Sequence, residues 1–384
     1  MEKQDQLLMK KQNKNLVLEI IKNQSPISRM EIAKITGMSP TTITRIVNEL
    51  HIQGFVRETE LVTSGVGRRA TLLDICGDVL YTIGIELDKA IIKIGIVNFN
   101  GEIVAWQSVS REESEKYEET LEKVMFLMKD LIRQQQIPLE KFIGVAVGLP
   151  GLIDYQNGVV KVSDQLKWKN VNLASDLHKN TGFDVIIDNE LKMKIVAENN
   201  VGKAKDSQNA VLVGIGSGIG SAIILNGQIH RGESNNAGEI GHTVLDPTGN
   251  VCKCGKIGCL ATYISEGAIV SDARKVKDIT SIEDVFNSYR DGESWAVNIM
   301  DRTSTYIALA ISNILCLYDP EVIILSGSTI QKFPEIKEAI EKKLNLFIWE
   351  PIKEKVRIVY SELSDRGVVF GAAIQAQHIL LNLE

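Results

Sequence analysis

Residues Gly241–Tyr263 read GHTVLDPTGNVCKCGKIGCLATY, and three of the chain's five cysteines fall within eight positions of this stretch. A histidine, His242, stands near its beginning. A chain with so few cysteines gathers three of them for a disulfide, for a metal ion or by coincidence. The choice among these three explanations decides the compartment, the fold family and part of the function.

The compartment can be predicted from the rest of the chain. The N-terminal residues, MEKQDQLLMKKQNKN, contain no apolar run that could serve as a signal peptide. No stretch approaches the roughly 18 uninterrupted apolar residues of a membrane helix. We therefore expect a cytoplasmic protein without a membrane partner. Structural disulfides are rare in that reducing compartment, so the cysteine cluster favours a metal.

One imidazole and three thiolates make a complete tetrahedral ligand set for Zn²⁺. The predicted ligands are His242, Cys252, Cys254 and Cys259. Gly255 and Gly258 allow a tight loop that points three sulfur atoms inward, and no ligand position remains for water, so a structural zinc is expected. The alternative is three free thiols beside a core histidine. Cys76 and Cys316 lie in apolar surroundings and are expected to be small buried residues.

Length and charge indicate more than one domain. A chain of 384 residues is too long for one ordinary core, so two or three domains are expected. The composition, 44% hydrophobic and 24% charged, is typical of a globular protein. Residues 1–75 carry 11 Lys and Arg against 8 Asp and Glu, whereas the remaining residues carry 32 against 41. Only the N-terminal segment therefore suits a polyanionic partner.

Three short helices are predicted in this segment. The apolar residues 16–21 mark the first helix, which ends near Pro26. A second helix begins at Ser28, where Glu31 completes a capping box. Gly37 then breaks the chain, as a tight turn between two helices requires. Helices joined in this way are typical of a helix-turn-helix.

A third helix begins at Ser39, a good N-cap, followed by Pro40, a good first residue. Its predicted buried stripe consists of Ile43, Ile46, Val47 and Leu50. Short hydroxyl side chains and an arginine at a helix start suit base edges in the major groove. The predicted DNA-binding residues here are Ser39, Thr41, Thr42, Thr44 and Arg45. The alternative is a small helical bundle with a merely polar face.

The following residues predict a wing. Residues 54–57 and 70–73 are two candidate strands, and the glycine-rich segment between them contains Arg68 and Arg69. Arginines flanked by glycine can enter a narrow minor groove, where the negative potential is strongest. The alternative is a solvated loop.

From residue 80 onward the pattern predicts an α/β body of two related lobes with a cleft between them. The predicted strands are 81–86, 91–98, 103–108, 142–148, 185–188, 210–216, 221–225 and 322–326. The predicted helices are 116–136, a helix that ends near Gly202, and 303–317. An order of three strands, a helix, a strand and a helix occurs twice.

At this point the chain resembles the ROK proteins, the sugar kinases and sugar-responsive repressors of the actin/hexokinase (RNase H-like) superfold. The matching pieces are Gly214–Ser221 (GIGSGIGS), Ala237–His242 (AGEIGH), the CKCGKIGC cluster, Pro150-Gly151 and Asp188-Asn189-Glu190. The N-terminal helix-turn-helix is found in the family's repressors and not in its kinases, which points to the xylose-repressor-like branch. The expected domains are a winged helix-turn-helix over residues 1–75 and a two-lobed ROK body over 76–384.

The resemblance implies a sugar site in the cleft. In the family the zinc loop positions the residues that hold the sugar, and the zinc histidine also touches it. A carboxylate can accept two hydrogen bonds from adjacent hydroxyl groups. The implied sugar-binding residues are Gly151, Asp164, Asn189, Glu190, Glu239 and His242.

Several departures from the family pattern concern catalysis and the ligand. Family kinases have an aspartate where this chain has Glu190, which could still act as a base. They also have an Asp-Ile-Gly-Gly-Thr turn where this chain has residues 86–89, Glu-Leu-Asp-Lys, so that side chains replace the phosphate-binding glycines. The late glycine turn is reduced to residues 326–328. A family glutamate is replaced by Ala261, and Lys192 stands where Asn is usual, which indicates either an anionic sugar or a solvated lysine.

The sequence therefore predicts a sugar-responsive transcriptional regulator, a repressor, rather than an enzyme. Its expected partners are double-stranded operator DNA, a sugar or sugar-phosphate effector, and further copies of the chain in a homodimer or dimer of dimers. One alternative is an ATP-dependent sugar kinase with an accessory DNA-binding domain. Another is a zinc-stabilised binding module without DNA activity.

Overall fold

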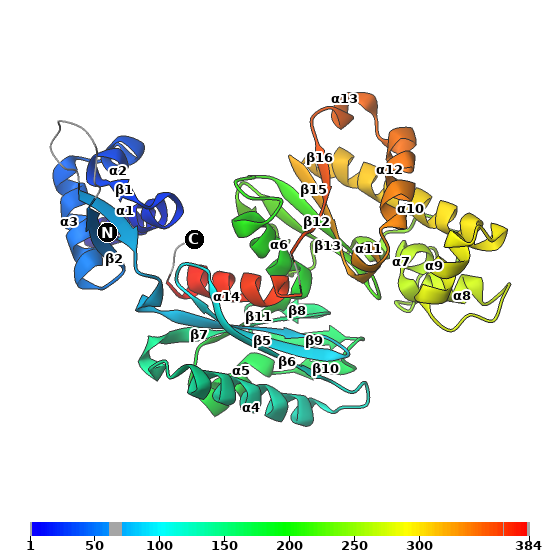
Figure 1. Cartoon of the computed structure of the whole chain (residues 1–384), viewed down its shortest axis with the longest axis horizontal. Coiled ribbons are helices and arrows are strands. Elements are labelled where there is room, and N and C mark those ends of the chain that lie inside the picture. Colours follow the sequence, from blue (N-terminus) through cyan, green and yellow to red (C-terminus); the bar gives the residue numbers. More distant parts are fainter. Residues whose placement is uncertain (1, 61–70, 364, 382–384) are drawn as a thin grey trace.

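The computed structural model describes residues 2–60, 71–363 and 365–381 (Figure 1). A small unit of helices with a three-stranded sheet is followed by a mixed α/β body of two lobes. The predicted fold class is therefore confirmed. Within the described residues no helix combines the length and the apolar character that crossing a membrane requires.

The N-terminal unit is a winged helix-turn-helix. Its elements are α1 (Glu2–Gln24), β1 (Ile27–Ser28), α2 (Arg29–Thr36), α3 (Pro40–Ile52), β2 (Val56–Glu60) and β3 (Thr71–Ile75). Ser28 and Glu31 form the predicted capping box of α2. Gly37 ends α2 in the left-handed region, with φ of 70°, a conformation that favours glycine. The strands pair antiparallel in the order β1-β3-β2, which forms the wing.

The predicted stripe of α3 is the centre of this unit's core. All four of its residues are buried: Ile43, Ile46, Val47 and Leu50. The hydrophobic core of the N-terminal unit extends into the α/β body, because Phe99 from the body is fully buried among the same apolar residues. The rings of Phe55 and Phe99 meet edge to face, with 5.3 Å between their centroids. The N-terminal unit and the first lobe therefore share apolar packing.

Lobe 1 is built on a five-stranded sheet in the order β11-β7-β4-β5-β6. Its strands are β4 (Tyr81–Leu87), β5 (Ile91–Asn98), β6 (Ile103–Ser110), β7 (Phe142–Leu149) and β11 (Val185–Asn189). Helices α4 (Tyr117–Gln135) and α5 (Leu173–Thr181) cover one face (Figure 1). A small antiparallel sheet of β8 (Leu152–Asp154), β9 (Val159–Ser163) and β10 (Trp168–Val171), which was not predicted, follows β7.

Lobe 2 repeats this topology with the strand order β14-β13-β12-β15-β16. Its strands are β12 (Ala210–Ile215), β13 (Ile219–Leu225), β14 (Gln228–Ile229), β15 (Val322–Ser326) and β16 (Arg357–Tyr360). Its helices are α7 (Ala261–Ile264), α8 (Glu266–Ala273), α9 (Ile282–Arg290), α10 (Ser294–Tyr318), α11 (Ser328–Lys332), α12 (Glu335–Phe347) and α13 (Glu350–Lys353). In both sheets the first strand pairs antiparallel with the second and parallel with the fourth. The predicted repeat is confirmed.

Two equivalent helices, α6 (Glu190–Val201) and α14 (Gly367–Leu380), pack against each other between the lobes (Figure 1). A Cβ atom on Gly371 would come within 1.8 Å of the Met193 carbonyl oxygen, and one on Gly84 within 1.9 Å of the Val369 carbonyl oxygen. The backbones of α14, α6 and β4 therefore approach more closely than any side chain allows. This packing makes the two helices the junction of the lobes.

Two expectations need correction. Helix α10 begins at Ser294, nine residues before the predicted start. Cys316, expected to be buried, is exposed on this helix, because it follows the buried Leu315 by one residue and a helix turns by about 100° per residue. Cys76 is half-buried.

Candidate functional site

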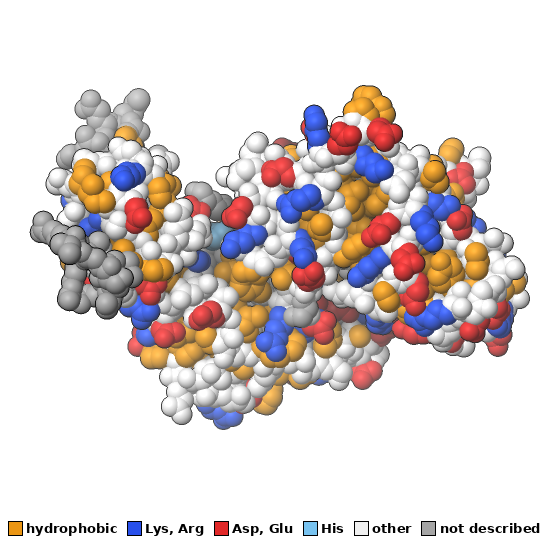
Figure 2. Space-filling view, turned by 45° about the horizontal axis from the view of Figure 1, so that its top comes forward, with side chains coloured by type: hydrophobic (Ala, Val, Ile, Leu, Met, Phe, Trp, Pro, Cys, Tyr) orange, Lys and Arg blue, Asp and Glu red, His pale blue; other side chains and the backbone are white. Residues whose placement is uncertain are grey.

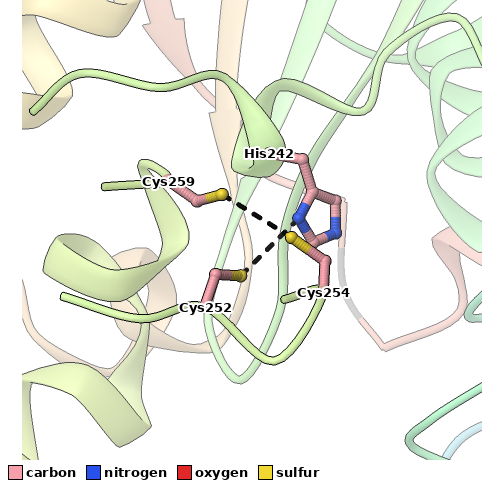
Figure 3. Close-up of side chains that lie close together, drawn as sticks. All are labelled: His242, Cys252, Cys254 and Cys259. Carbon is pink, nitrogen blue, oxygen red and sulfur yellow. Dashed lines mark hydrogen bonds between the residues drawn. The ribbon is translucent and has the colours of Figure 1, made fainter. Parts of the chain in front are cut away.

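The cysteine loop brings the four predicted metal ligands together (Figure 3). The ligand atoms of His242, Cys252, Cys254 and Cys259 all lie within 4.8 Å of one another. Gly258 makes the close turn, because its φ is 74° and a Cβ atom there would meet the Asp246 carbonyl oxygen at 1.6 Å. The bridge between Val251 and Ile257 closes the loop.

The separations in this cluster fit a tetrahedral ion. The Sγ atoms of Cys254 and Cys259 are 3.7 Å apart, and Sγ of Cys252 is 3.7 Å from Nδ1 of His242. Sulfur atoms about 2.3 Å from a tetrahedral zinc lie about 3.8 Å apart. The donor set of three thiols and one imidazole is also the one that zinc prefers. The four residues could therefore hold a structural Zn²⁺.

A cleft of about 1850 Å³ separates the two lobes. All six sugar-binding residues that the family resemblance implied line this cleft: Gly151, Asp164, Asn189, Glu190, Glu239 and His242. Cys252 and Cys254 also line it, so the cysteine loop forms part of the wall. The tertiary structure thus brings residues from both lobes to one concave surface.

Asn189 stands where β11 ends and α6 begins. Its Oδ1 accepts a hydrogen bond from the Leu191 amide at 2.9 Å, which caps the helix. Its Nδ2 donates to the Gly151 carbonyl at 3.3 Å. The backbone at position 151 requires glycine, because its φ is 126° and a Cβ atom there would lie 2.3 Å from the Val162 carbonyl oxygen. The amide therefore has a fixed orientation at the cleft wall.

Glu190 carries the most unusual carboxyl group in the cleft. Its Oε2 is buried and has no hydrogen-bond partner within the described residues. Burial, with a smaller contribution from the nearby charges of Asp88, Glu239 and Glu86, raises the pKa of Glu190 to about 8 against the opposing effect of a backbone hydrogen bond. A buried carboxyl oxygen without a partner is costly, and a ligand that supplied a hydroxyl group would satisfy it.

Glu239 faces the same space from lobe 2, immediately before the short 3-10 helix Ile240–His242. Burial raises the pKa of Glu239, and the neighbouring His242 and Lys192 oppose this shift. With Glu190 and Glu239 on opposite lobes, the cleft presents two carboxyl groups to a ligand bound between them. Such a pair can accept hydrogen bonds from several hydroxyl groups of one sugar.

Lys192 is neither solvated nor part of the cleft wall, so of the two alternatives for this residue the solvated lysine was wrong. Only 3% of the residue is exposed, and its Nζ donates to the Asn235 carbonyl oxygen at 2.6 Å. The reason is its position on the inner face of α6, where a loop from lobe 2 covers it.

The turn at the end of β4 in lobe 1, at residues 86–89, does not have the form of a phosphate-binding loop. The Asp88 side chain lines the cleft, and its Oδ1 accepts a hydrogen bond from the Ala90 amide at 3.3 Å. The Asp88 amide donates to the Ile91 carbonyl at 2.9 Å. Two backbone N–H groups of this turn are therefore already bonded, and the carboxylate would repel a phosphate.

A second carboxylate lies at the start of α11 in lobe 2. Oε1 of Glu266 accepts hydrogen bonds from the hydroxyl groups of Ser328, at 2.6 Å, and Thr329, at 3.2 Å. The Glu266 amide donates to the Gly216 carbonyl at 3.0 Å. Ser328 lines the cleft, and the Glu266 carboxylate is bonded to its hydroxyl group without itself lining the cleft.

The GIGSGIGS loop has a packing role. Gly214 and Gly220 pair across β12 and β13, and a Cβ atom on either would approach the Leu191 side chain to between 2.8 and 2.9 Å. These glycines therefore make room for α6 at the junction of the lobes, a requirement that does not depend on any phosphate ligand.

The exposed side of α3 is the candidate DNA-binding face. The hydroxyl groups of Ser39 and Thr42 lie 2.9 Å apart, and Ser39 caps the helix by accepting from the Thr42 amide. Thr44 donates to the Pro40 carbonyl. Thr41, Thr44 and Arg45 are exposed. The other two predicted residues, Arg68 and Arg69, lie outside the described residues.

The Arg45 side chain is accessible to a binding partner. More than half of its side chain, 55%, is exposed, and its ion pair with Glu49 is long at 3.5 Å. On the face of the molecule in Figure 2, basic and acidic side chains are interspersed over the body. A mixed surface of this kind attracts a polyanion less than a basic stripe does.

Fold and cleft together define a two-lobed α/β protein of the actin/hexokinase type that carries an N-terminal winged helix-turn-helix. The ROK family model matches residues 82–379 and the MarR family model matches residues 16–70. The chain belongs to the ROK family.

Two relatives and two solved structures illustrate this membership. The chain is 28% identical to the xylose repressor of Bacillus subtilis, with 98% of each chain covered. It is 26% identical to the DNA-binding transcriptional dual regulator NagC of Escherichia coli, covering 98% of this chain and 94% of that one. The structure of a ROK family transcriptional regulator, a homolog of the E. coli MLC protein, matches with a TM-score of 0.83 and 27% identity over 98% of both chains. A ROK hexokinase from Thermus thermophilus shares the fold, with a TM-score of 0.70 and 22% identity over 79% of this chain and 100% of the hexokinase.

Two polar residues beside the cleft were not predicted from the sequence. Arg231 and Asn235 both contact Asp188, which is fully buried. Their only signal in the sequence is their place shortly before Ala237–His242. Spacing cannot reveal that a lobe 2 loop meets a lobe 1 strand, because the contact spans more than 40 residues.

Proposed function

We propose that this chain is a sugar-responsive transcriptional regulator that represses by binding double-stranded operator DNA. The observation that carries the proposal is the combination, in one chain, of an exposed helix start on α3 and a cleft with a buried carboxyl oxygen that lacks a partner among the described residues. The relatives named as a xylose repressor and as the DNA-binding transcriptional dual regulator NagC support the same conclusion.

The proposed reader comprises residues 1–75, and the proposed effector domain residues 76–384. In the reader, Ser39, Thr41, Thr42, Thr44 and Arg45 would meet the major groove, and Arg68 and Arg69 the minor groove. A single reader with a modest positive charge would bind weakly, so we propose a homodimer or dimer of dimers that engages paired half-sites. Chromosomal DNA as target implies a cytoplasmic protein.

The proposed effector site uses Gly151, Asp164, Asn189, Glu190, Glu239 and His242. A structural Zn²⁺ on His242, Cys252, Cys254 and Cys259 would fix the loop that carries Glu239. The metal would stabilise the local fold and would leave no coordination position for chemistry.

The second candidate function is an ATP-dependent sugar kinase with an accessory DNA-binding domain, which the hexokinase fold suggests. Against it stand the Asp88 carboxylate on the lobe 1 turn and the Glu266 carboxylate at the start of α11. Asp88 lines the cleft and would place negative charge beside an ATP phosphate, and the Glu266 carboxylate already occupies the hydroxyl groups of Ser328 and Thr329. We therefore propose that the cleft binds a sugar without turning ATP over.

Retention of genomic fragments followed by fluorescence anisotropy, with and without a panel of sugars, tests the regulator proposal. Glu239→Ala should abolish the sugar's effect on DNA affinity and leave sugar-free DNA binding intact, because Glu239 lines the cleft and is not part of the α3 face. Glu233→Ala removes an exposed carboxylate from the same loop and should behave as the wild type. A sugar response that persists in Glu239→Ala would move the effector site elsewhere, and a protein that retains no genomic fragment would contradict the regulator proposal.

A coupled assay of ATP consumption over the same sugars tests the kinase alternative. We expect no turnover above background. Sugar phosphorylation that disappears in Glu190→Gln would establish the kinase and overturn the proposal.

A further inference from the structure

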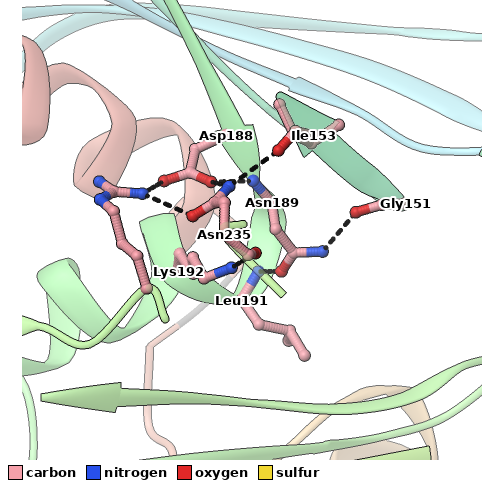
Figure 4. Close-up of polar contacts among 8 residues, drawn as sticks. Gly151, Ile153, Asp188, Asn189, Leu191, Lys192 and Asn235 are labelled. Carbon is pink, nitrogen blue, oxygen red and sulfur yellow. Dashed lines mark hydrogen bonds and ion pairs between the residues drawn. The ribbon is translucent and has the colours of Figure 1, made fainter. Parts of the chain in front are cut away.

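A loop of lobe 2 reaches across to lobe 1 beside the proposed effector site (Figure 4). It follows β14 and leads to Glu239. Within it, Arg231 forms an ion pair with Asp188, at the end of β11, whose side chain is fully buried. The Arg231 guanidinium also stacks on Tyr155, with its central carbon 3.7 Å from the ring centroid. The loop is therefore fastened to lobe 1 by charge and by stacking.

Asn235 completes this connection. Its Nδ2 donates to Oδ1 of Asp188 at 2.9 Å and to the Ile153 carbonyl at 3.1 Å. Its Oδ1 accepts from Arg231 at 3.1 Å, and its own carbonyl accepts from Lys192. We call the four residues Asp188, Lys192, Arg231 and Asn235 the latch.

The latch touches the effector site from both lobes. On the lobe 1 side, Oδ1 of Asp188 accepts a hydrogen bond from the Asn189 amide at 2.8 Å, which orients the residue that caps α6. On the lobe 2 side, Asn235 lies four residues before Glu239 in the same loop. The latch thus fixes how far apart Asn189 and Glu239 stand.

Neither of the two cations of the latch is free to bind an anionic ligand. Arg231 is paired with Asp188, and Lys192 is 3% exposed and bonded to Asn235. Neither residue lines the cleft, whereas the carboxyl groups of Asp164, Glu190 and Glu239 do.

In the part of the chain that the structure describes, five lysines line the cleft. Ion pairs hold three of them, Lys93 with Glu86, Lys275 with Asp272 and Lys332 with Glu283. A fourth, Lys194, is attracted by the charges of Glu86 and Glu198, and the fifth, Lys253, belongs to the cysteine loop. The carboxyl groups of the effector site therefore outnumber the uncommitted cations of the cleft.

We propose that the effector is an uncharged sugar and that Lys192 and Arg231 are positioning residues that hold the Glu239 loop across the two lobes, not receptors for a phosphate. This inference rests on the proposed function and names the class of its effector. A phosphorylated sugar would bring a dianion to a wall that carries the acidic side chains of Asp88, Asp164 and Glu239, whereas neutral hydroxyl groups can donate to each of them.

Isothermal titration calorimetry on the full-length, zinc-loaded protein tests the proposal. The probes are D-xylose, D-glucose with its 6-phosphate, and N-acetyl-D-glucosamine with its 6-phosphate. At least one neutral sugar should bind, and the phosphorylated probes should bind about tenfold more weakly than that sugar, or not at all. Tighter binding of a phosphorylated sugar would overturn this inference and leave the proposed function standing. Failure of every probe, neutral and phosphorylated, to bind would overturn both.

Substitutions in the latch separate positioning from phosphate recognition. Lys192→Met keeps the aliphatic stem and should weaken the neutral sugar about three- to tenfold, with an unchanged ratio of sugar to sugar-phosphate affinity. If Lys192 receives a phosphate instead, only the phosphorylated probe would lose affinity, and the proposal would be wrong. Lys179→Met, an exposed lysine on α5, should change neither value.

Arg231 supplies the second test. Arg231→Met should weaken the neutral sugar about tenfold or more, and Arg231→Lys, which retains the charge beside Asp188, should recover part of the loss. Zinc content and the melting temperature without sugar show whether each variant is folded. Full affinity in a folded Arg231→Met protein would contradict the positioning role.

Discussion

Lys22 on α1 donates a hydrogen bond to Oε1 of Gln377 on α14 at 3.1 Å, although 355 positions separate the two residues. Gln377 is fully buried and also donates to the hydroxyl of Thr82 and the carbonyl of Asn98. The other end of α14 lines the inter-lobe cleft through Gly367. One helix therefore joins the reader to the cleft.

We expect Lys22→Met and Gln377→Leu each to lower the free energy of unfolding by about 1–3 kcal/mol, because each removes the hydrogen bond between Lys22 Nζ and Gln377 Oε1 and leaves the remaining atom without this partner. The double variant should lose less than the sum of the two, which denaturant unfolding measures as a coupling energy. The sugar's effect on operator affinity should also decrease in both. Lys11→Met, an exposed lysine on the same helix, is the control. Additive losses would show that this contact does not join the two units.

The raised pKa of Glu190 predicts how the stability of the protein depends on pH. Its pKa is about 8 in the folded protein and near 4.5 when unfolded, so the folded state binds the extra proton between these values. Its contribution to stability is therefore present below pH 4.5 and is lost as the pH rises to about 8. Glu190→Gln removes this loss and should be more stable than the wild type at pH 8 by a few kcal/mol.

Thermal unfolding of both proteins between pH 5 and pH 9 measures this difference. Glu233→Gln, an exposed carboxylate, should follow the wild type across the range. A constant difference between Glu190→Gln and the wild type would mean that Glu190 is not protonated on folding.

The cysteine cluster predicts one zinc ion per chain. Elemental analysis of protein purified without added metal should find it, and Cys254→Ser should lose it. Because the same loop leads from Glu239, metal loss should also weaken sugar binding. Cys316→Ser, an exposed cysteine on α10, should retain the full metal content. Sub-stoichiometric metal in the wild type would contradict the assignment.

Arg45 and the arginine pair at 68 and 69 should affect DNA binding differently. Arg45→Ala should cost about 1–3 kcal/mol of operator affinity and relax the preference at one base position. Arg68→Ala with Arg69→Ala should instead flatten the salt dependence. Arg133→Ala, 82% exposed on α4 of lobe 1, removes the same charge away from the reader and should change neither. Wild-type affinity in both reader variants would place the recognition surface elsewhere.

Local sequence signals determined the helices of the reader, the five strands of the lobe 1 sheet and three of the five strands of the lobe 2 sheet, whereas β14 and β16 were not predicted. The capping box at Ser28, the N-cap at Ser39 and the stripe of α3 are set by contacts within a few residues, so their patterns can be recognised without a fold. The same holds for the cysteine loop, whose ligands lie within 18 positions of one another.

Only the tertiary structure decided how these pieces meet. Helix α14 was not predicted, because residues 367–377 are all buried and a helix that is apolar all round has no 3.6-residue period to recognise. The pairing of Arg231 with Asp188, the burial of Lys192 and the contact of Lys22 with Gln377 depend on segments brought together by the two lobes. Local patterns fix which elements form, whereas packing between distant segments fixes which charges remain free for a ligand.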